Sequence, residues 1–260
     1  MSAASPRGRL VLVPTSLDHG CEQQVPLEQV LPLATVQAAA ALTHWISENA
    51  KSTRAFLKRV DAQVPLAQPI QAQQITELPH AVHKKGDHHG GARFDARALL
   101  APALQGQDIG LISEAGMPAV ADPGSSVVRA AHDLGIEVLP LVGPVSILLT
   151  LAASGLNGQD FAFVGYLPQD AAARAQRIRE LEALALKTGQ TQLFIETPYR
   201  NPALWQALLQ TLKPGTRLAI GQGLTLADAH IQSRAVSAWQ QARNADATLA
   251  RAPAVFAIGP

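Results

Sequence analysis

The stretch LISEAGMPAVADPGS (residues 111–125) decides the fold, because it joins an apolar run to a helical run through a constrained loop. Residues 108–113 are typical of a buried strand, and residues 125–134 of a helix ended by Gly135, a common left-handed C-cap residue. Two glycines and two prolines stand between them: Gly116, Pro118, Pro123 and Gly124. Glycine lets the backbone approach a ligand and proline stiffens the chain, so the loop predicts a ligand contact at the end of a strand.

The same alternation of strand and helix patterns extends outward in both directions. Strands are expected at 9–14, 43–47, 108–113, 136–142, 161–167, 191–198, 216–221, 229–237 (antiparallel) and 252–259. Helices are expected at 34–42, 52–60, 93–106, 125–134, 171–187 and 201–212, with another whose first turn contains Pro144. The stretch 61–92 is expected to be loop. Such alternation predicts an α/β fold with helices on both faces of mostly parallel sheets, divided into domains 1–142 and 143–260.

Composition narrows the classes of function. The chain has 260 residues, is 47% hydrophobic and carries a net charge of +1, so any nucleic-acid partner must be held by a local patch. Cys21 is the single cysteine, which excludes an internal disulfide and a cysteine-rich metal site, and we expect no metal. No segment has 18 unbroken apolar residues, so we expect no membrane association and a cytoplasmic location.

Unusual residues follow four of the expected strands. These segments are VPTSLD (13–18), SEAGMPAVADPG (113–124), LVGPVS (141–146) and IETPYR (195–200). Ligands of open α/β sheets collect at the carboxyl ends of strands, so these four loops are the candidate site. None of them is a Walker loop or a GxGxxG turn.

The motifs SEAGMPAVADPG, EVLPLVGPVSILLTLAASGL and FAFVGYLP, in this order, resemble the tetrapyrrole methylase superfamily, the class III S-adenosylmethionine (SAM) methyltransferases. ENAKSTRAFLKRV (48–60) and LFIETPYRN (193–201) further resemble its branch that methylates a cytidine ribose 2′-hydroxyl in bacterial small-subunit ribosomal RNA. APAVFAIG (252–259) resembles the closing strand of the superfamily. The chain resembles a divergent member of that branch, and Met117 stands where the family commonly has threonine.

The resemblance implies a homodimer of two-domain α/β chains, with SAM in a cleft between the domains. It assigns backbone contacts with the methionine part and ribose of SAM to Pro14, Gly116, Met117, Pro118 and Val120. The turn into the second domain contributes Ser146 and Ile147. The adenine side is implied to be walled by Glu196, Gly223, Leu224, Pro253 and Ala254.

No single catalytic base emerges from the sequence. The candidates are Lys84, His88, His89, Asp122, Glu196 and Arg200. Each has a structural alternative: residues 83–89 as a solvated loop, Asp122 as the cap of the helix near Ser125, and Glu196 with Arg200 as a local ion pair. Similarly, Arg174, Arg177 and Arg179 could hold phosphate, but Glu180 and Glu182 lie among them and favour a solvated helix face.

Three functions therefore remain open. The first is SAM-dependent methylation of small-subunit ribosomal RNA, with RNA or the small subunit as partner. The second is methylation of a tetrapyrrole or another small molecule. The third is a non-catalytic protein that binds SAM, a nucleotide or a partner protein.

Overall fold

The computed structural model describes residues 7–18, 20–21, 23–79, 94–242 and 253–260. The chain divides into two compact units, each with its own five-stranded sheet. The first unit contains residues up to Gly20 and Gln24–Pro144, and the second contains Val145–Pro260 together with Cys21–Gln23. The domain boundary between residues 142 and 143 stays a prediction.

The sheet of the first unit is parallel throughout, with strand order β3-β2-β4-β1-β5. Its strands are β1 (Leu10–Val13), β2 (His44–Ser47), β3 (Gln74–Glu77), β4 (Ile109–Ile112) and β5 (Val138–Pro140). Its helices are α1 (Leu33–Ala41), α2 (Ala50–Asp61), α4 (Ala101–Leu104) and α5 (Ser125–Asp133). Short 3-10 turns lie at Leu27–Gln29, Ile70–Ala72 and Arg97–Leu100.

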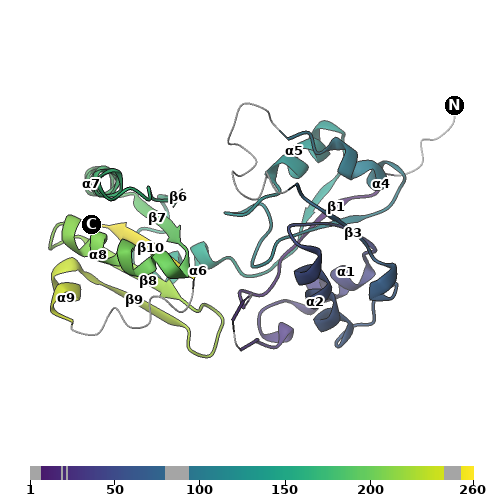
Figure 1. Cartoon of the computed structure of the whole chain (residues 1–260), viewed down its shortest axis with the longest axis horizontal. Helices are drawn as coiled ribbons and strands as arrows, with labels where there is room; N and C mark the ends of the chain where they lie inside the picture. Colours follow the sequence, from purple (N-terminus) through teal and green to yellow (C-terminus); the bar gives the residue numbers. More distant parts are fainter. Residues whose placement is uncertain (1–6, 19, 22, 80–93, 243–252) are drawn as a thin grey trace. The chain divides into compact units, whose positions relative to one another are not determined.

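Helices cover both faces of this sheet, as Figure 1 shows for α1 and α2 on one side and α4 and α5 on the other. The two-residue period of the strands explains the arrangement. Val11 and Val13 of β1 pack in the core beneath α1 and α2, whereas Leu10 packs in the core beneath α4 and α5. Sheets buried on both faces need continuous apolar strands, which LVLV and IGLI provide.

The second unit has a mixed sheet with strand order β6-β7-β10-β8-β9. Its strands are β6 (Phe161–Tyr166), β7 (Thr191–Glu196), β8 (Arg217–Gln222), β9 (His230–Ala235) and β10 (Ala254–Gly259). Its helices are α6 (Ser146–Ser154), α7 (Ala171–Thr188), α8 (Asn201–Thr211) and α9 (Val236–Gln241), with a 3-10 turn at Pro198–Arg200. One core lies under α7, α8 and α9, and a smaller one lies under α6.

The α/β class is confirmed, and four details differ from the sequence-based expectations. In the second sheet only β6 and β7 pair in parallel, while the other pairs are antiparallel. Strand β3 lies in a stretch expected to be loop; it is a partly exposed edge strand, so its sequence carries little apolar pattern. The expected helix at 93–106 is reduced to a 3-10 turn and a four-residue helix. The last is α9, a helix the sequence did not predict.

Candidate active site

Loops at the carboxyl ends of β1, β4 and β5 contact one another in the first unit. The Thr15 amide donates a hydrogen bond to the Gly116 carbonyl at 2.9 Å, which joins the β1 loop to the β4 loop. A Cβ on Gly143 would lie 2.4 Å from the Pro14 ring, so the β5 loop packs directly on the end of β1. A Cβ on Gly116 would lie 3.4 Å from the Pro144 carbonyl oxygen. Three of the four strand-end segments singled out in the sequence therefore meet at one edge of one sheet.

Because of this packing, Pro144 does not enter the helix that follows. Helix α6 begins at Ser146, after an extended Val145 with φ −129° and ψ 107°. The expectation of Pro144 in the first helical turn was wrong. The contact between Gly143 and Pro14 keeps these residues in the loop.

The β4 loop is tightly wound. Gly116 and Gly124 have φ of 78° and 132°, and Ala119 and Ala121 both have φ of 64°. Left-handed alanines are strained, and such strain is concentrated at sites where the backbone has a function. The observation agrees with a loop that presents backbone groups to a ligand.

The structure places the residues assigned to the cofactor in two groups, one in each unit. In the first unit, Pro14, Gly116 and Pro118 are buried, Met117 is partly buried, and Val120 is 41% exposed. Apart from Pro14 they all belong to the β4 loop.

The second group lies along one edge of the second sheet. Glu196, Ala254 and Gln222 stand in one row across β7, β10 and β8, so Gly223, Leu224 and Pro253 follow or precede that row. Ser146 and Ile147 open α6, whose Thr150 would contact a Cβ on Gly221 at 2.4 Å. Cofactor contact by either group stays a prediction.

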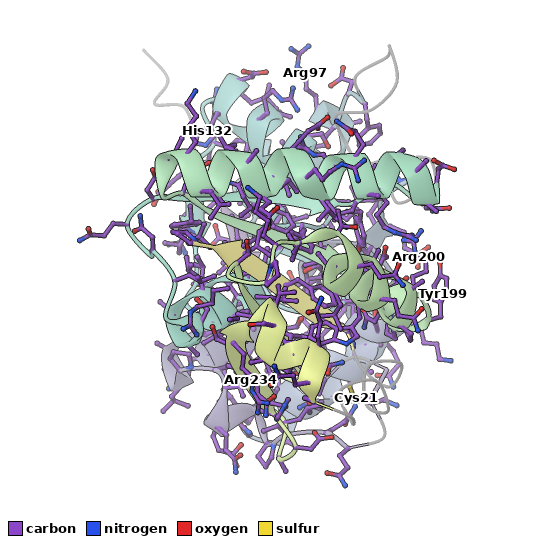
Figure 2. The ribbon with its side chains drawn as sticks, turned by 90° about the vertical axis from the view of Figure 1, so that its left-hand side faces the viewer. Cys21, Arg97, His132, Tyr199, Arg200 and Arg234 are labelled. Carbon is purple, nitrogen blue, oxygen red and sulfur yellow. The ribbon has the colours of Figure 1, made fainter. Side chains whose placement is uncertain are left out.

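Glu196 and Arg200 form the local ion pair that the sequence allowed. Their Oε1 and Nη2 atoms are 2.7 Å apart, and the Thr197 amide donates to the same carboxylate oxygen at 2.7 Å. The neighbouring Tyr199 is 77% exposed, and Figure 2 shows it beside Arg200 at the surface. The pair stabilises the turn after β7, which gives both residues a structural role.

A polar pocket of about 350 Å³ lies at the carboxyl edge of the first sheet. Its walls come from residues after β1, from the first turns of α2 and from the end of β4. Six lining residues carry hydroxyls or amides: Thr15, Ser16, Gln24, Asn49, Ser52 and Ser113. Four more are charged: Asp18, Lys51, Arg59 and Glu114. Thr15 belongs both to this pocket and to the hydrogen bond with Gly116, so the pocket adjoins the β4 loop.

Arg59 of α2 holds the β1 loop in place. It donates to both carboxylate oxygens of Asp18 at 3.0 Å, to Ser16 Oγ at 2.9 Å and to the Val25 carbonyl at 2.6 Å. Burial of Asp18 acts to raise its pKa, but the hydrogen bonds from Arg59, Ser16 and the Val25 amide lower it below the ordinary value. The Arg59–Asp18 ion pair therefore fixes the shape of the loop after β1.

Acidic side chains gather beside the pocket at the ends of β2 and β4. The Glu48 carboxylate accepts a hydrogen bond from the Glu114 amide at 3.0 Å. Burial raises the pKa of Asp122 to about 7, with a further contribution from the charge of Glu48 and a smaller one from Glu114. The Ser113 hydroxyl acts in the opposite direction, although it makes no hydrogen bond of standard geometry.

Asp122 is not the N-cap residue of α5. That residue is Gly124. Asp122 lies two residues earlier, and the negative charges of Glu48, after β2, and Glu114, after β4, act on its carboxyl. The φ of 132° at Gly124, which side-chain-bearing residues rarely adopt, explains why glycine occupies the cap.

The structure gives different outcomes for the other residues that the sequence suggested as catalytic or phosphate-binding. Lys84, His88 and His89 lie outside the described residues. On α7, Arg177 pairs with Glu180 as expected for a solvated face, but Glu182 is buried and accepts hydrogen bonds from the Lys213 amide and the Thr216 hydroxyl. Sequence reasoning named no role for Asp18, Arg59 or Asn49, although the segments 13–18 and 48–60 had been singled out.

Among the residues that the structure describes, no helix is long and apolar enough to span a membrane.

Comparison with known proteins agrees with this geometry. Residues 33–237 match the model of a family described as Tetrapyrrole (Corrin/Porphyrin) Methylases. A protein named Ribosomal RNA small subunit methyltransferase I from Vibrio cholerae is 33% identical over 138 residues, 53% of this chain and 46% of that protein. The Mesorhizobium japonicum protein of the same name is 39% identical over 140 residues, 54% of this chain and 45% of that protein. Each match thus spans about half the length of the relative.

A solved structure shows the same fold. The crystal structure of uroporphyrin-III-C-methyltransferase from Thermus thermophilus aligns with a TM-score of 0.51 at 17% identity, covering 97% of this chain and 94% of that one. At this identity the likeness concerns the fold alone. With a family model that matches most of its length, the chain belongs to the tetrapyrrole methylase family.

Proposed function

We propose that the chain is a SAM-dependent methyltransferase that modifies a ribose 2′-hydroxyl of small-subunit ribosomal RNA. The observation that carries the proposal is the meeting of the β1, β4 and β5 loops at one sheet edge, through Thr15, Gly116, Pro14 and Gly143. The names of the relatives that match at 33% and 39% identity supply the substrate class.

The residues at this edge fit SAM. The cofactor carries a sulfonium, an ammonium and a carboxylate, which backbone N–H and C=O groups can satisfy without a buried charge of the protein. A Cβ on Gly143 would overlap the Pro14 ring, and Gly116 has a φ of 78° that disfavours a side chain, so backbone forms the surface at both positions. The residues that would hold the cofactor are Pro14, Gly116, Met117, Pro118 and Val120 in the first unit. The second unit would add Ser146, Ile147, Glu196, Gly223, Leu224, Pro253 and Ala254.

When bound, SAM supplies an electrophilic methyl group on its sulfonium. The protein must then hold the acceptor hydroxyl in line and accept its proton, since positioning and proton transfer are what such a displacement requires. Asp122, with a pKa of about 7, is suited to accept that proton near neutral pH. Its neighbour Ser113 lines the polar pocket, which supports a role for Asp122 toward a ligand held there.

We further propose that the protein acts in the cytoplasm as a homodimer, the form that the family resemblance implies. Tetrapyrrole methylation is the alternative activity, and a non-catalytic binding protein is the alternative class. The test is transfer of a labelled methyl group from SAM to small ribosomal subunits isolated from a strain that lacks this gene. Transfer to a cytidine ribose supports the proposal. Transfer only to a tetrapyrrole, or no binding of S-adenosylhomocysteine at millimolar concentration, contradicts it.

A further inference from the structure

The polar pocket of the first unit has the size and chemistry of a site for one nucleoside. Its volume of about 350 Å³ lies near the lower end of the range of about 300–1,000 Å³ typical of small-molecule sites. Neutral hydroxyls and amides, such as those of Thr15, Asn49 and Ser52, match the hydroxyls of a ribose and the edge of a base. Phe56 supplies an apolar wall.

The charges of the pocket argue against a porphyrin-type ligand. Such molecules carry several carboxylates, and they would meet two further carboxylates here, on Asp18 and Glu114. The guanidinium of Arg59 is already bound to Asp18 on both oxygens. Among the lining residues this leaves Lys51 as the other cation.

A basic stripe runs from the rim of the pocket along α2. Lys51, Arg54 and Lys58 are spaced by three and four residues, so they share one helix face, and all three are exposed. The same face carries Ala55, which lines the pocket between them. The stripe ends near Asp61, whose carboxylate accepts a hydrogen bond from the Leu66 amide. A row of lysine and arginine beside a polar pocket is complementary to a phosphate backbone with one nucleoside turned inward.

We propose that this pocket takes the acceptor nucleotide of a single-stranded RNA, and that the stripe of Lys51, Arg54 and Lys58 binds the adjoining phosphates. The inference rests on the proposed function and names the part of the molecule that recognises the substrate. The position of the pocket supports the inference, because Thr15 links the pocket to Gly116 of the loop assigned to the cofactor.

The first test replaces the charges of the stripe. The triple variant K51Q/R54Q/K58Q is compared with R174Q/R177Q/R179Q, which removes the same charge from α7. Binding of a short fluorescent single-stranded RNA is measured over a range of salt concentrations. The α2 variant should bind at least about tenfold more weakly, with a log–log salt slope reduced by about 2. Equal losses in the two variants, or a larger loss in the α7 variant, would overturn the inference.

The second test fills the pocket. Ala55→Phe places a ring in it, whereas Ala41→Phe places the same ring on an exposed residue at the end of α1, which leads to the opposite edge of the sheet. A55F should lose RNA binding and methyl transfer while binding S-adenosylhomocysteine as A41F does. If wild type and A55F transfer methyl groups to RNA equally well, the pocket assignment is wrong and the proposed function stands. If wild type binds RNA through the pocket but transfers nothing, the proposed function is wrong. Absence of RNA binding by the wild type would contradict both the pocket assignment and the proposed function.

Discussion

Arg59 and Asp18 form a two-pronged ion pair in which each carboxylate oxygen receives a guanidinium hydrogen bond at 3.0 Å. The Asp18 side chain is 3% exposed and the Arg59 side chain 21%. The pair joins α2 to the loop after β1, and that loop forms one wall of the polar pocket. The shape of the proposed substrate site therefore depends on one buried pair of charges.

Removing Arg59 should destabilise the protein strongly. Arg59→Met leaves the Asp18 carboxylate buried without its cation, and loss of one partner of such a pair costs about 3 kcal/mol or more. The free energy of unfolding from urea titration measures it. Arg9→Met is the control, because the Arg9–Asp108 pair is even shorter, at 2.6 Å, but its side chains are 44% and 32% exposed, so its loss should cost less than about 1 kcal/mol. Similar losses in both variants would contradict the role given to the clamp.

The stability of the protein should fall as pH rises toward neutrality because of Asp122. Its folded pKa of about 7 lies above the ordinary carboxyl value, so in the interval between them the folded state holds a proton that the unfolded chain releases. Asp122→Asn keeps a neutral side chain at every pH. Relative to wild type, D122N should gain about 1–2 kcal/mol between pH 5 and pH 8, a figure reduced for partial exposure. Parallel pH profiles for the two proteins would exclude a raised pKa.

Gly143→Ala should weaken cofactor binding. The new methyl group would lie 2.4 Å from the Pro14 ring and force the β5 and β1 loops apart. Overpacking of this kind costs about 1–3 kcal/mol, which corresponds to a loss of about 5-fold to 150-fold in affinity if binding needs the loops in contact. Titration calorimetry with S-adenosylhomocysteine measures the change. Gly158→Ala has nothing within 4 Å of the new methyl group and should bind as wild type does. Unchanged affinity in G143A would show that cofactor binding does not need the contact between the β1 and β5 loops.

Glu180 and Glu182 of α7 should differ sharply in how much each stabilises the folded protein. Glu182 is 4% exposed and accepts hydrogen bonds from the Lys213 amide, at 2.7 Å, and from the Thr216 hydroxyl. Glu182→Ala leaves the buried Thr216 hydroxyl and the partly buried Lys213 amide without their acceptor and should cost about 2–3 kcal/mol. Glu180→Ala on the solvated face should leave the thermal midpoint unchanged. Equal midpoints for the two variants would contradict the buried contact.

The sequence predicted the elements that are long and apolar, and it missed those whose pattern is short or exposed. LVLV and IGLI indicated buried strands correctly, because both faces of the first sheet are covered. Strand β3 escaped because an edge strand with mostly exposed side chains has no apolar signature. The antiparallel pairs of β10 could not be read at all, since pairing direction depends on strands far apart in the sequence.

The candidate site likewise has features that leave a local pattern in the sequence and features that do not. Glycines and prolines marked the loops that meet at the sheet edge, because backbone conformation leaves a local signal. The clamp between Asp18 and Arg59 joins residues 41 positions apart, and no local pattern announces such a pair. Asp122 illustrates the opposite error. A carboxylate just before a helix suggested a cap, whereas its actual surroundings are set by Glu48 and Glu114 on other segments.

The most direct test of the central claim is mass spectrometry of nucleosides from small-subunit ribosomal RNA, taken from a strain with this gene and from a strain lacking it. The account predicts that one 2′-O-methylcytidine disappears on deletion and returns when the wild-type gene, but not the A55F variant, is restored. An identical set of methylated nucleosides in the two strains would contradict the assignment of ribosomal RNA as the substrate.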